Sequence, residues 1–175
     1  IMVDGSPVTS GRFTVNANGE LSQKTFSIPT KTLNAATAFI LTIEPAVGDD
    51  PAPSAVHLLA GNFNGNSGTM TIEDSRAVGT NFSTATGKYI LATPTNDNPD
   101  DDYSGVWFID NSSGSGVAGL NLPTLPNGWI YEGWAVVNGT PVSTGTFSSV
   151  TGSDNFSGFS GPNQGPPFPG EDFLM

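Results

Sequence analysis

The densest group of side chains that could do chemistry is a run of acids in the stretch TNDNPDDDYSG. Its four carboxylates belong to Asp97, Asp100, Asp101 and Asp102. Calcium binds several oxygen ligands at roughly 2.3 to 2.6 Å, and a cation would relieve the repulsion between adjacent acids. However, the spacing matches no EF-hand loop, and Pro99 interrupts the run. We therefore interpret the stretch as a solvated hairpin tip, with a calcium site as the alternative.

Residues for nucleophilic or acid–base catalysis are few. His57 is the one histidine, so any Ser-His-Asp triad or histidine metal site would depend on it, and no G-x-S-x-G motif accompanies it. Glycoside hydrolysis needs two carboxyl groups roughly 5 to 9 Å apart. The candidate glutamates are Glu44, Glu73 and Glu132. Two of these lie in strand motifs, where a capping or orienting role is simpler, so the sequence predicts that the protein is not an enzyme.

Aromatic side chains offer a further kind of site. They are Trp107, Trp129, Tyr131 and Trp134. Such rings can form a flat platform on which a sugar stacks. Strand alternation puts Trp129 and Tyr131 on one face and Trp134 on the other. Because aromatic residues on both faces are typical of a strand buried between layers, a core role is the preferred interpretation and a ligand platform the alternative.

The composition narrows the compartment and the partners. The 175 residues carry a formal net charge of −11, which repels nucleic acids and anionic membranes. Charged residues make up 12% of the chain, about half the roughly 25% of an ordinary soluble domain. There is no cysteine, and no run approaches the roughly 18 to 20 apolar residues that cross a bilayer. These features predict a secreted or cell-envelope protein, bacterial in origin, with no membrane insertion by this segment and any export signal upstream of Ile1.

The elements that must position these residues are short strands. Runs rich in β-branched and aromatic residues, such as AFILTIEP, GKYILATP and WIYEGWAVV, alternate with Gly, Pro, Asn and Asp. Only TKTLNAATA and EDSRAVG could form helical turns. The sequence therefore predicts an all-β protein, an antiparallel β-sandwich of the Ig-like kind built from one or two packed pseudo-repeats.

One phrase occurs twice. VDGSPVTSGRF begins at Val3 and VNGTPVSTGTF at Val137, with six identities and mostly Ser/Thr or Asp/Asn exchanges between them. The dipeptides Asp4-Gly5 and Asn138-Gly139 are strong signals for two-residue hairpin turns, because both residues tolerate positive φ. We therefore expect one hairpin module to be present in two copies.

Each copy holds a part that the other lacks. The second copy follows the long strand NLPTLPNGWIYEGWAVV, whereas only Ile1 and Met2 precede the first. We predict a first repeat over residues 1–64 without its opening strands, a second over 65–152, and an extended Gly/Pro-rich tail over 153–175. In that tail, Phe168 and Phe173 resemble anchors that dock on this molecule or on a neighbour.

These phrases resemble the extracytoplasmic domain of anti-sigma-K factors. The likeness rests on LPTLPNGWIYEGWAVVNGTPVSTGTF (Leu122 to Phe147) and FILTIEPAVGDDPAPSAVHLLAG (Phe39 to Gly61), and it covers about half of the chain. It includes the Tyr131-x-x-Trp134 spacing and the Glu44-Pro45 pair. The resemblance implies a β-sandwich outside the cytoplasm. The family's sigma-binding domain and membrane helix have no counterpart in this sequence, so sigma-factor binding is not implied.

Two functions follow as expectations. The first is a non-catalytic structural subunit of an extracellular fibre or surface layer, which pairs with copies of itself or a neighbouring extracellular protein by strand complementation. Its expected interface residues are Ile1, Met2, Val3, Phe168 and Phe173. The second is an extracytoplasmic sensory or ligand-binding module of an anti-sigma-factor-like envelope protein. Calcium is the single cofactor candidate for either.

Overall fold

The computed structural model describes residues 1–174, apart from the side chains at positions 30 and 31. The chain divides into two compact units, Ile1–Thr80 and Asn81–Met175. They are named unit 1 and unit 2 below, and each is described by itself. The division lies sixteen residues beyond the 64/65 boundary that the repeat pattern predicts.

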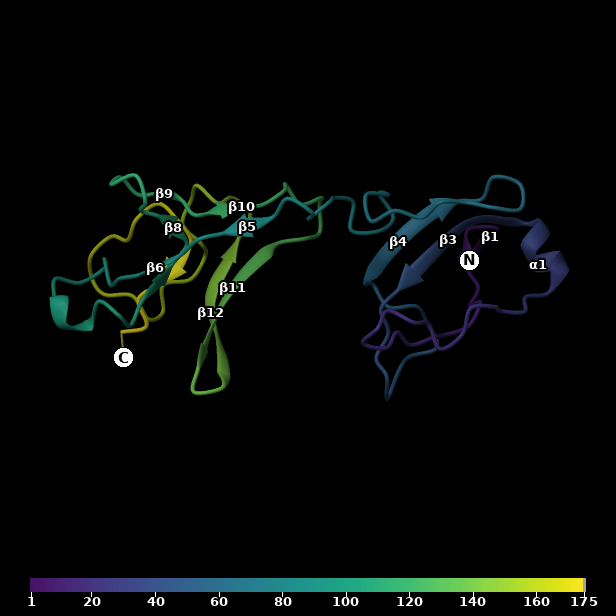
Figure 1. Cartoon of the computed structure of the whole chain (residues 1–175), viewed down its shortest axis with the longest axis horizontal. Coiled ribbons are helices and arrows are strands. Elements are labelled where there is room, and N and C mark those ends of the chain that lie inside the picture. Colours follow the sequence, from purple (N-terminus) through teal and green to yellow (C-terminus); the bar gives the residue numbers. More distant parts are fainter. Residues whose placement is uncertain (175) are drawn as a thin grey trace. The chain divides into compact units, whose positions relative to one another are not determined.

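Unit 1 is organised around one antiparallel sheet. Its elements are β1 (Met2–Val3), β2 (Ser6–Pro7), α1 (Thr30–Asn34), β3 (Ala36–Thr42) and β4 (His57–Asn62). The strand order is β2-β1-β3-β4, and Figure 1 labels β1, β3 and β4 of this sheet. The short helix α1 follows Pro29 and ends at Ala35, within the stretch TKTLNAATA where a helical turn is expected. It leads directly into β3, the longest strand of this sheet.

Small residues at the centre of β3 and β4 let other backbone approach this sheet closely. Ala38 and Ala60 are each 1% exposed. Ala60 forms an isolated bridge with Thr71, in which each backbone N–H donates to the other carbonyl at 3.1 and 2.9 Å. A Cβ atom at Gly61 would meet the carbonyl of Thr69. Glycine is therefore required at this point of the sheet.

Unit 2 is a set of small antiparallel sheets. Its elements are β5 (Thr86–Gly87), β6 (Ile90–Leu91), the 3₁₀ helix η1 (Pro99–Asp101), β7 (Val106–Trp107), β8 (Ile109–Asp110), β9 (Val117–Ala118), β10 (Leu120–Asn121), β11 (Tyr131–Val137), β12 (Thr140–Phe147) and β13 (Gly170–Glu171). The sheets have the orders β13-β7-β6, β11-β12, β8-β9 and β10-β5. The turn of the long hairpin β11–β12 extends beyond the other strands of this unit (Figure 1).

The core of unit 2 combines aromatic and aliphatic side chains with close backbone contacts. Trp107, Ile109 and Phe147 are buried, and the ring of Phe147 stacks on Tyr131 at a centroid distance of 5.7 Å. A Cβ atom at Gly170 would meet Trp107, so a glycine lets β13 pass over the indole. The Gly/Pro-rich residues expected to form a separate extended tail thus pack as part of unit 2.

The prediction of an all-β protein is confirmed at this level, because strands predominate and α1 spans five residues. The strands form several small sheets, and the finer prediction of an Ig-like sandwich stays a prediction. Within residues 1–174, no helix combines the length and the apolar character that a membrane span requires.

Candidate functional site

The two copies of the repeated phrase form the same turn. In the first copy φ is 48° at Asp4 and 77° at Gly5, and in the second it is 50° at Asn138 and 82° at Gly139. Two consecutive residues with positive φ define the type I′ turn, whose twist matches that of antiparallel strands. The predicted hairpin turns are therefore confirmed in both places.

The register of the two hairpins is also the same. Val3 pairs with Ser6 and Met2 with Pro7, just as Val137 pairs with Thr140 and Val136 with Pro141. Residues of an antiparallel pair alternate between positions that exchange hydrogen bonds and positions that do not. Proline has no N–H, and both Pro7 and Pro141 occupy positions that exchange no hydrogen bonds with the partner strand. The backbone groups of Met2 and Val136 therefore point away from their hairpin partners.

The outer side of the hairpin, away from its own second strand, has different neighbours in the two units. In unit 1, β3 pairs with β1 through Met2↔Ala38 and Val3↔Ala36, and the Thr37 hydroxyl donates to the Met2 carbonyl at 3.4 Å. In unit 2, β11 belongs to a two-stranded sheet, and no strand within residues 1–174 pairs with its outer side. Only unit 1 therefore completes the outer side of its hairpin.

The far side of β12 is bonded to its own unit at one residue. The Thr146 N–H donates to the Asn155 side-chain carbonyl at 2.8 Å, and the Asn155 N–H donates back to the Thr146 carbonyl at 3.0 Å. The outer side of β12 also lacks one donor, because Pro141 has no N–H, whereas β11 contains no proline. We call the outer side of Tyr131–Val137 the β11 edge.

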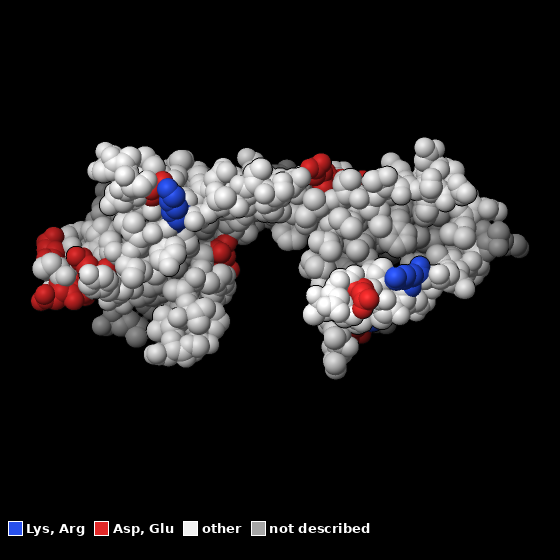
Figure 2. Space-filling model, viewed as in Figure 1, with Lys and Arg blue, Asp and Glu red and all other residues white. Residues whose placement is uncertain are grey.

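Apolar side chains are exposed along the β11 edge. Trp134 is 53% exposed, Val136 71% and Val137 47%. The single charged residue of the hairpin, Glu132, accepts a hydrogen bond from the Ser143 hydroxyl at 2.7 Å. Figure 2 shows acidic side chains over the region of η1, whereas the turn end of the hairpin carries no charge. The β11 edge therefore combines backbone without a strand partner with a largely apolar surface on which Glu132 is the one charged residue.

The N-terminal residues expected at an interface lie inside the sheet of unit 1. Ile1 is 7% exposed, and its ammonium donates to the Val8 carbonyl at 2.8 Å. Met2 and Val3 form β1 between β2 and β3. The expectation of an unfilled sheet edge at β1 is therefore wrong, because β3 of the same unit covers that side. The structure shows the open edge at the other copy of the hairpin.

The two phenylalanines expected to be anchors contact residues of unit 2. The Phe173 ring lies 5.7 Å from that of Phe159, which in turn packs edge-on against Phe156 at 5.4 Å. Phe168 lines a cavity of ≈ 420 Å³. Its other lining residues include Trp107, Phe156, Asp154, Asn163 and Gln164. Of the two docking sites left open by the sequence, these contacts lie on this molecule.

The aspartates of the acidic loop bind donors of their own chain. The Asp101 carboxylate accepts from the Thr93 hydroxyl and the Asn96 amide, each at 2.8 Å, and these hydrogen bonds, that from Thr93 foremost, lower its pKa. Asp102 also accepts from Thr93, at 3.1 Å. Asp97 accepts from Asn163 at 3.0 Å, and Asp100 lies in η1, where its N–H is capped by Asn98. Within residues 1–174 no three acidic, histidine or cysteine side chains converge as metal ligands. The calcium site therefore stays a prediction without support from this geometry.

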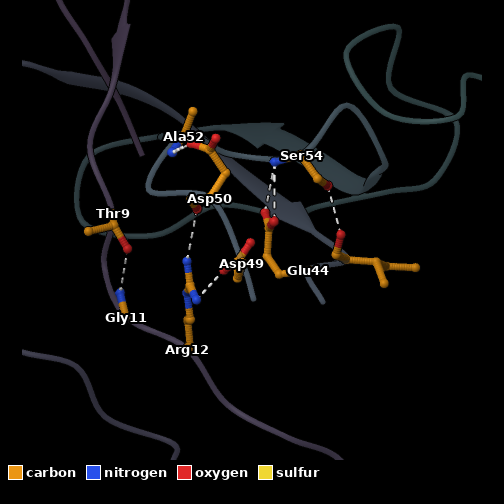
Figure 3. A network of polar contacts seen from close by, with 9 residues as sticks. Thr9, Gly11, Arg12, Glu44, Asp49, Asp50, Ala52 and Ser54 are labelled. Atoms are coloured by element: carbon orange, nitrogen blue, oxygen red, sulfur yellow. Dashed lines mark hydrogen bonds and ion pairs between the residues drawn. The ribbon is translucent and has the colours of Figure 1, made fainter. Parts of the chain in front are cut away.

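The catalytic candidates of unit 1 hold loops in place. The His57 ring lies 2.7 Å from the Arg76 carbonyl, to which Nδ1 donates. The Glu44 carboxylate accepts the Ser54 N–H at 3.0 and 3.2 Å, within a network that includes the ion pair between Arg12 and Asp49 (Figure 3). Both side chains are thus engaged with backbone of the same unit.

A group of buried carboxylates in unit 2 was missed by sequence reasoning. Glu171 and Asp172 are 0% exposed. Asp172 accepts from the Trp107 indole at 2.6 Å and from the Thr95 N–H at 2.8 Å, and Glu171 accepts from the Ser160 hydroxyl. Burial raises the pKa of nearby Asp154, and the charge of Glu171 adds to this shift. These acids attach the C-terminal segment to the unit, and the sequence signal GED carries no hint of that role.

The four aromatic candidates separate into two groups. Trp107 is 4% exposed, and the half-buried Tyr131 stacks on Phe147 and donates its hydroxyl to the Pro123 carbonyl at 2.7 Å, so these two pack against their own unit. Trp129 and Trp134 are 42% and 53% exposed. The predicted core role therefore describes the first group and not the second.

Comparison with protein-family models, with curated proteins and with solved structures gave no match.

Proposed function

We propose that this chain is a non-catalytic extracellular protein that acts through protein–protein contacts, as the structural subunit of an assembly held together by strand pairing. The observation that supports the proposal is the β11 edge. Its backbone has no strand partner within residues 1–174, and Trp134, Val136 and Val137 are exposed beside it. An unprotected edge of this kind recruits strands from other chains.

The hairpin lacks three of the features by which soluble proteins protect their edges. These are lysine on the edge strand, a proline at an outward-facing N–H, and a covering loop. The two strands contain no Lys or Arg, and Pro141 lies on β12. The register shift between Gly133 and Trp134 bends the strand without covering it. The edge is therefore suited to pairing, which favours an interaction role over that of an isolated module.

The proposal also includes a location outside the cytoplasm and a fold for the complete module. An acidic, cysteine-free chain with few charges suits a secreted or surface protein of bacteria. We infer an Ig-like sandwich as the complete module, with the hairpin as one part of it, in line with the resemblance to the extracytoplasmic domain of anti-sigma-K factors. Under this proposal each module is completed by strand pairing.

The proposal is tested by the oligomeric state of the intact chain. Multi-angle light scattering and negative-stain imaging over a rising concentration series should detect particles that grow beyond one chain. A protein that stays monomeric up to its solubility limit would contradict the assembly function.

The cavity in unit 2 supports a second candidate, an extracytoplasmic ligand-binding or sensory module. Its volume of ≈ 420 Å³ suits a small molecule, and its lining combines Trp107, Phe156 and Phe168 with amide and hydroxyl side chains. Saturation-transfer NMR with a panel of neutral saccharides tests this candidate. Transfer that is lost when Phe168 is changed to alanine would support it, and the absence of transfer across the panel would oppose it.

A further inference from the structure

We propose that the β11 edge binds a β-hairpin with the pattern of β3 and β4, in the register that β1 uses in unit 1. The inference rests on the proposed function, since it names the site and the chemistry of the partner for strand pairing. The occupant is an uncharged strand of small and apolar residues, supplied together with a second strand that pairs with it. The argument for this occupant comes from the duplicate hairpin.

In unit 1, the equivalent hairpin β1–β2 has a strand paired with its outer side. Its turn and register equal those of β11–β12, and the strand on the outer side is β3. Met2 corresponds to Val136, so the outward backbone groups that meet Ala38 in unit 1 have counterparts in unit 2 that meet no strand of the described residues 1–174. A strand of the β3 type therefore fits the backbone pattern of the β11 edge.

The β3 strand presents the correct side for this pairing. The Thr37 carbonyl accepts from the Phe63 N–H at 3.1 Å, so Thr37 faces the β4 side of the strand. Because the hydrogen-bonding direction alternates along a strand, the backbone groups of Ala36 and Ala38 face the opposite side. That side is the one β1 occupies.

The lengths and the side chains also match. Both β3 and β11 have seven residues, whereas β1 has two, and in the register of β1 a β3-type strand spans residues 132–137 of β11. In the register of β1, Val136 meets the position of Ala38. Two residues further along each strand, Trp134 meets the position of Ile40. An aromatic residue opposite a β-branched one is a favourable cross-strand pair.

The chemistry of the partner follows from the surface it must cover. The β3 strand, ATAFILT, contains no charged residue, and Ala38 at its centre is 1% exposed. A strand with acidic residues would meet an already acidic chain of net charge −11 and the carboxylate of Glu132. A second strand is needed because a single added strand would leave a new open edge.

The test uses the intact protein and a labelled peptide of residues 36–62, followed by fluorescence anisotropy. We expect saturable binding. The matched control peptide is methylated at the backbone nitrogen of Ala38, which removes the donor that faces β11 and leaves the pairing of β3 with β4 intact. Loss of that donor should weaken binding roughly tenfold, the effect of one backbone hydrogen bond.

Two protein variants locate the binding site. Val136→Pro removes the outward N–H of β11 without touching the pairing with β12, and it should weaken binding at least tenfold. Val136→Thr keeps that N–H and should bind like the parent protein. Circular dichroism measures whether each variant folds. If Val136→Pro does not fold, the comparison of the two peptides on the parent protein still tests the inference.

The outcomes separate this inference from the proposed function. Equal binding of both peptides, or unchanged binding by Val136→Pro, overturns the inference. Assembly of the protein without peptide binding also overturns it and leaves the assembly function standing. Peptide binding by a protein that never self-associates supports the inference and removes the assembly function.

Discussion

The hairpins β1–β2 and β11–β12 share a phrase, a turn and a register, yet one lies inside a four-stranded sheet and the other in a sheet of two. The shared part is local, since a two-residue turn and its flanking pairs follow from Asp-Gly or Asn-Gly and the residues beside them. The difference is non-local, because β3 begins some thirty residues after the turn that it covers. A repeated phrase thus determines a repeated hairpin without determining its neighbours.

The largest expected effect comes from destabilising one unit at a time, which tests whether the two units fold independently. Gly61→Ala would drive a methyl group into the Thr69 carbonyl of unit 1, and Gly105→Ala would drive one into the Ala92 carbonyl of unit 2. Each should cost its own unit about 3 kcal/mol, the upper range for overpacking. Native-state hydrogen exchange followed by NMR should show faster exchange in the altered unit alone. Equal loss of protection in both units would show that they fold as one.

Proline substitution at the equivalent positions Met2 and Val136 tests whether the outer side of each hairpin is paired. Met2→Pro removes an N–H that faces β3, so unit 1 should lose about 1 to 3 kcal/mol. Val136→Pro removes the equivalent N–H where no strand pairs, so the cost to unit 2 at low protein concentration should stay below about 1 kcal/mol. Urea titrations of both variants measure these values. An equal loss would mean that the β11 edge is already covered in solution.

Two carboxylates, Asp74 in unit 1 and Asp154 in unit 2, should respond oppositely to mild acid. In unit 1, hydrogen bonds from Arg76 lower the pKa of Asp74 to about 2, so its stabilising effect is present above the usual value of 3.8 and is lost as pH falls toward 2. In unit 2, burial raises the pKa of Asp154, so its ionisation in the folded state reduces stability as pH rises from 3.8 through that raised value.

Hydrogen exchange between pH 2 and 6 can follow each unit separately. Asp74→Asn should reduce the acid-side loss in unit 1, and Asp154→Asn should remove the destabilising contribution of Asp154 with rising pH in unit 2. Unchanged pH profiles in these variants would assign the pH dependence to other carboxylates.

The smallest effect is expected from calcium. The Asp101 and Asp102 carboxylates already accept from Thr93, and Asn96 donates to Asp101, so a cation would have to displace these donors. Millimolar calcium should therefore move the thermal midpoint of unfolding by less than about 1 °C in differential scanning calorimetry. A clear rise that Asp101→Asn abolishes would establish the site that the sequence suggests.

Local features were predictable from the sequence and long-range ones were not. The Asp4-Gly5 and Asn138-Gly139 turns and the predominance of strands follow from residue types over a few positions. The burial of Asp172 does not, because its partners Thr95 and Trp107 lie more than sixty residues away in the sequence. A sequence without cysteine or repeated charge pairs gives no signal for such distant contacts.

The location of the β11 edge was likewise not predictable from local sequence. The repeat indicated that one copy of the hairpin would lack neighbours, and that expectation fell on the N-terminal copy. The structure shows the unpaired side on β11, because Ile1 and β1 are covered by their own unit. Which of two equal hairpins is covered depends on strand β3, whose pairing partner cannot be read from its own residues.

All three tryptophans belong to unit 2, and they differ in their surroundings. The indole of Trp107 is enclosed and bound to Asp172, whereas that of Trp134 stands beside the β11 edge. Ultraviolet-excited emission from this protein therefore originates in one half of the chain and has one enclosed source, Trp107, and two solvent-facing ones, Trp129 and Trp134. Acrylamide should quench only the two solvent-facing sources, so a partial loss of quenching on shielding of Trp134 would give a label-free optical signal whenever a strand docks.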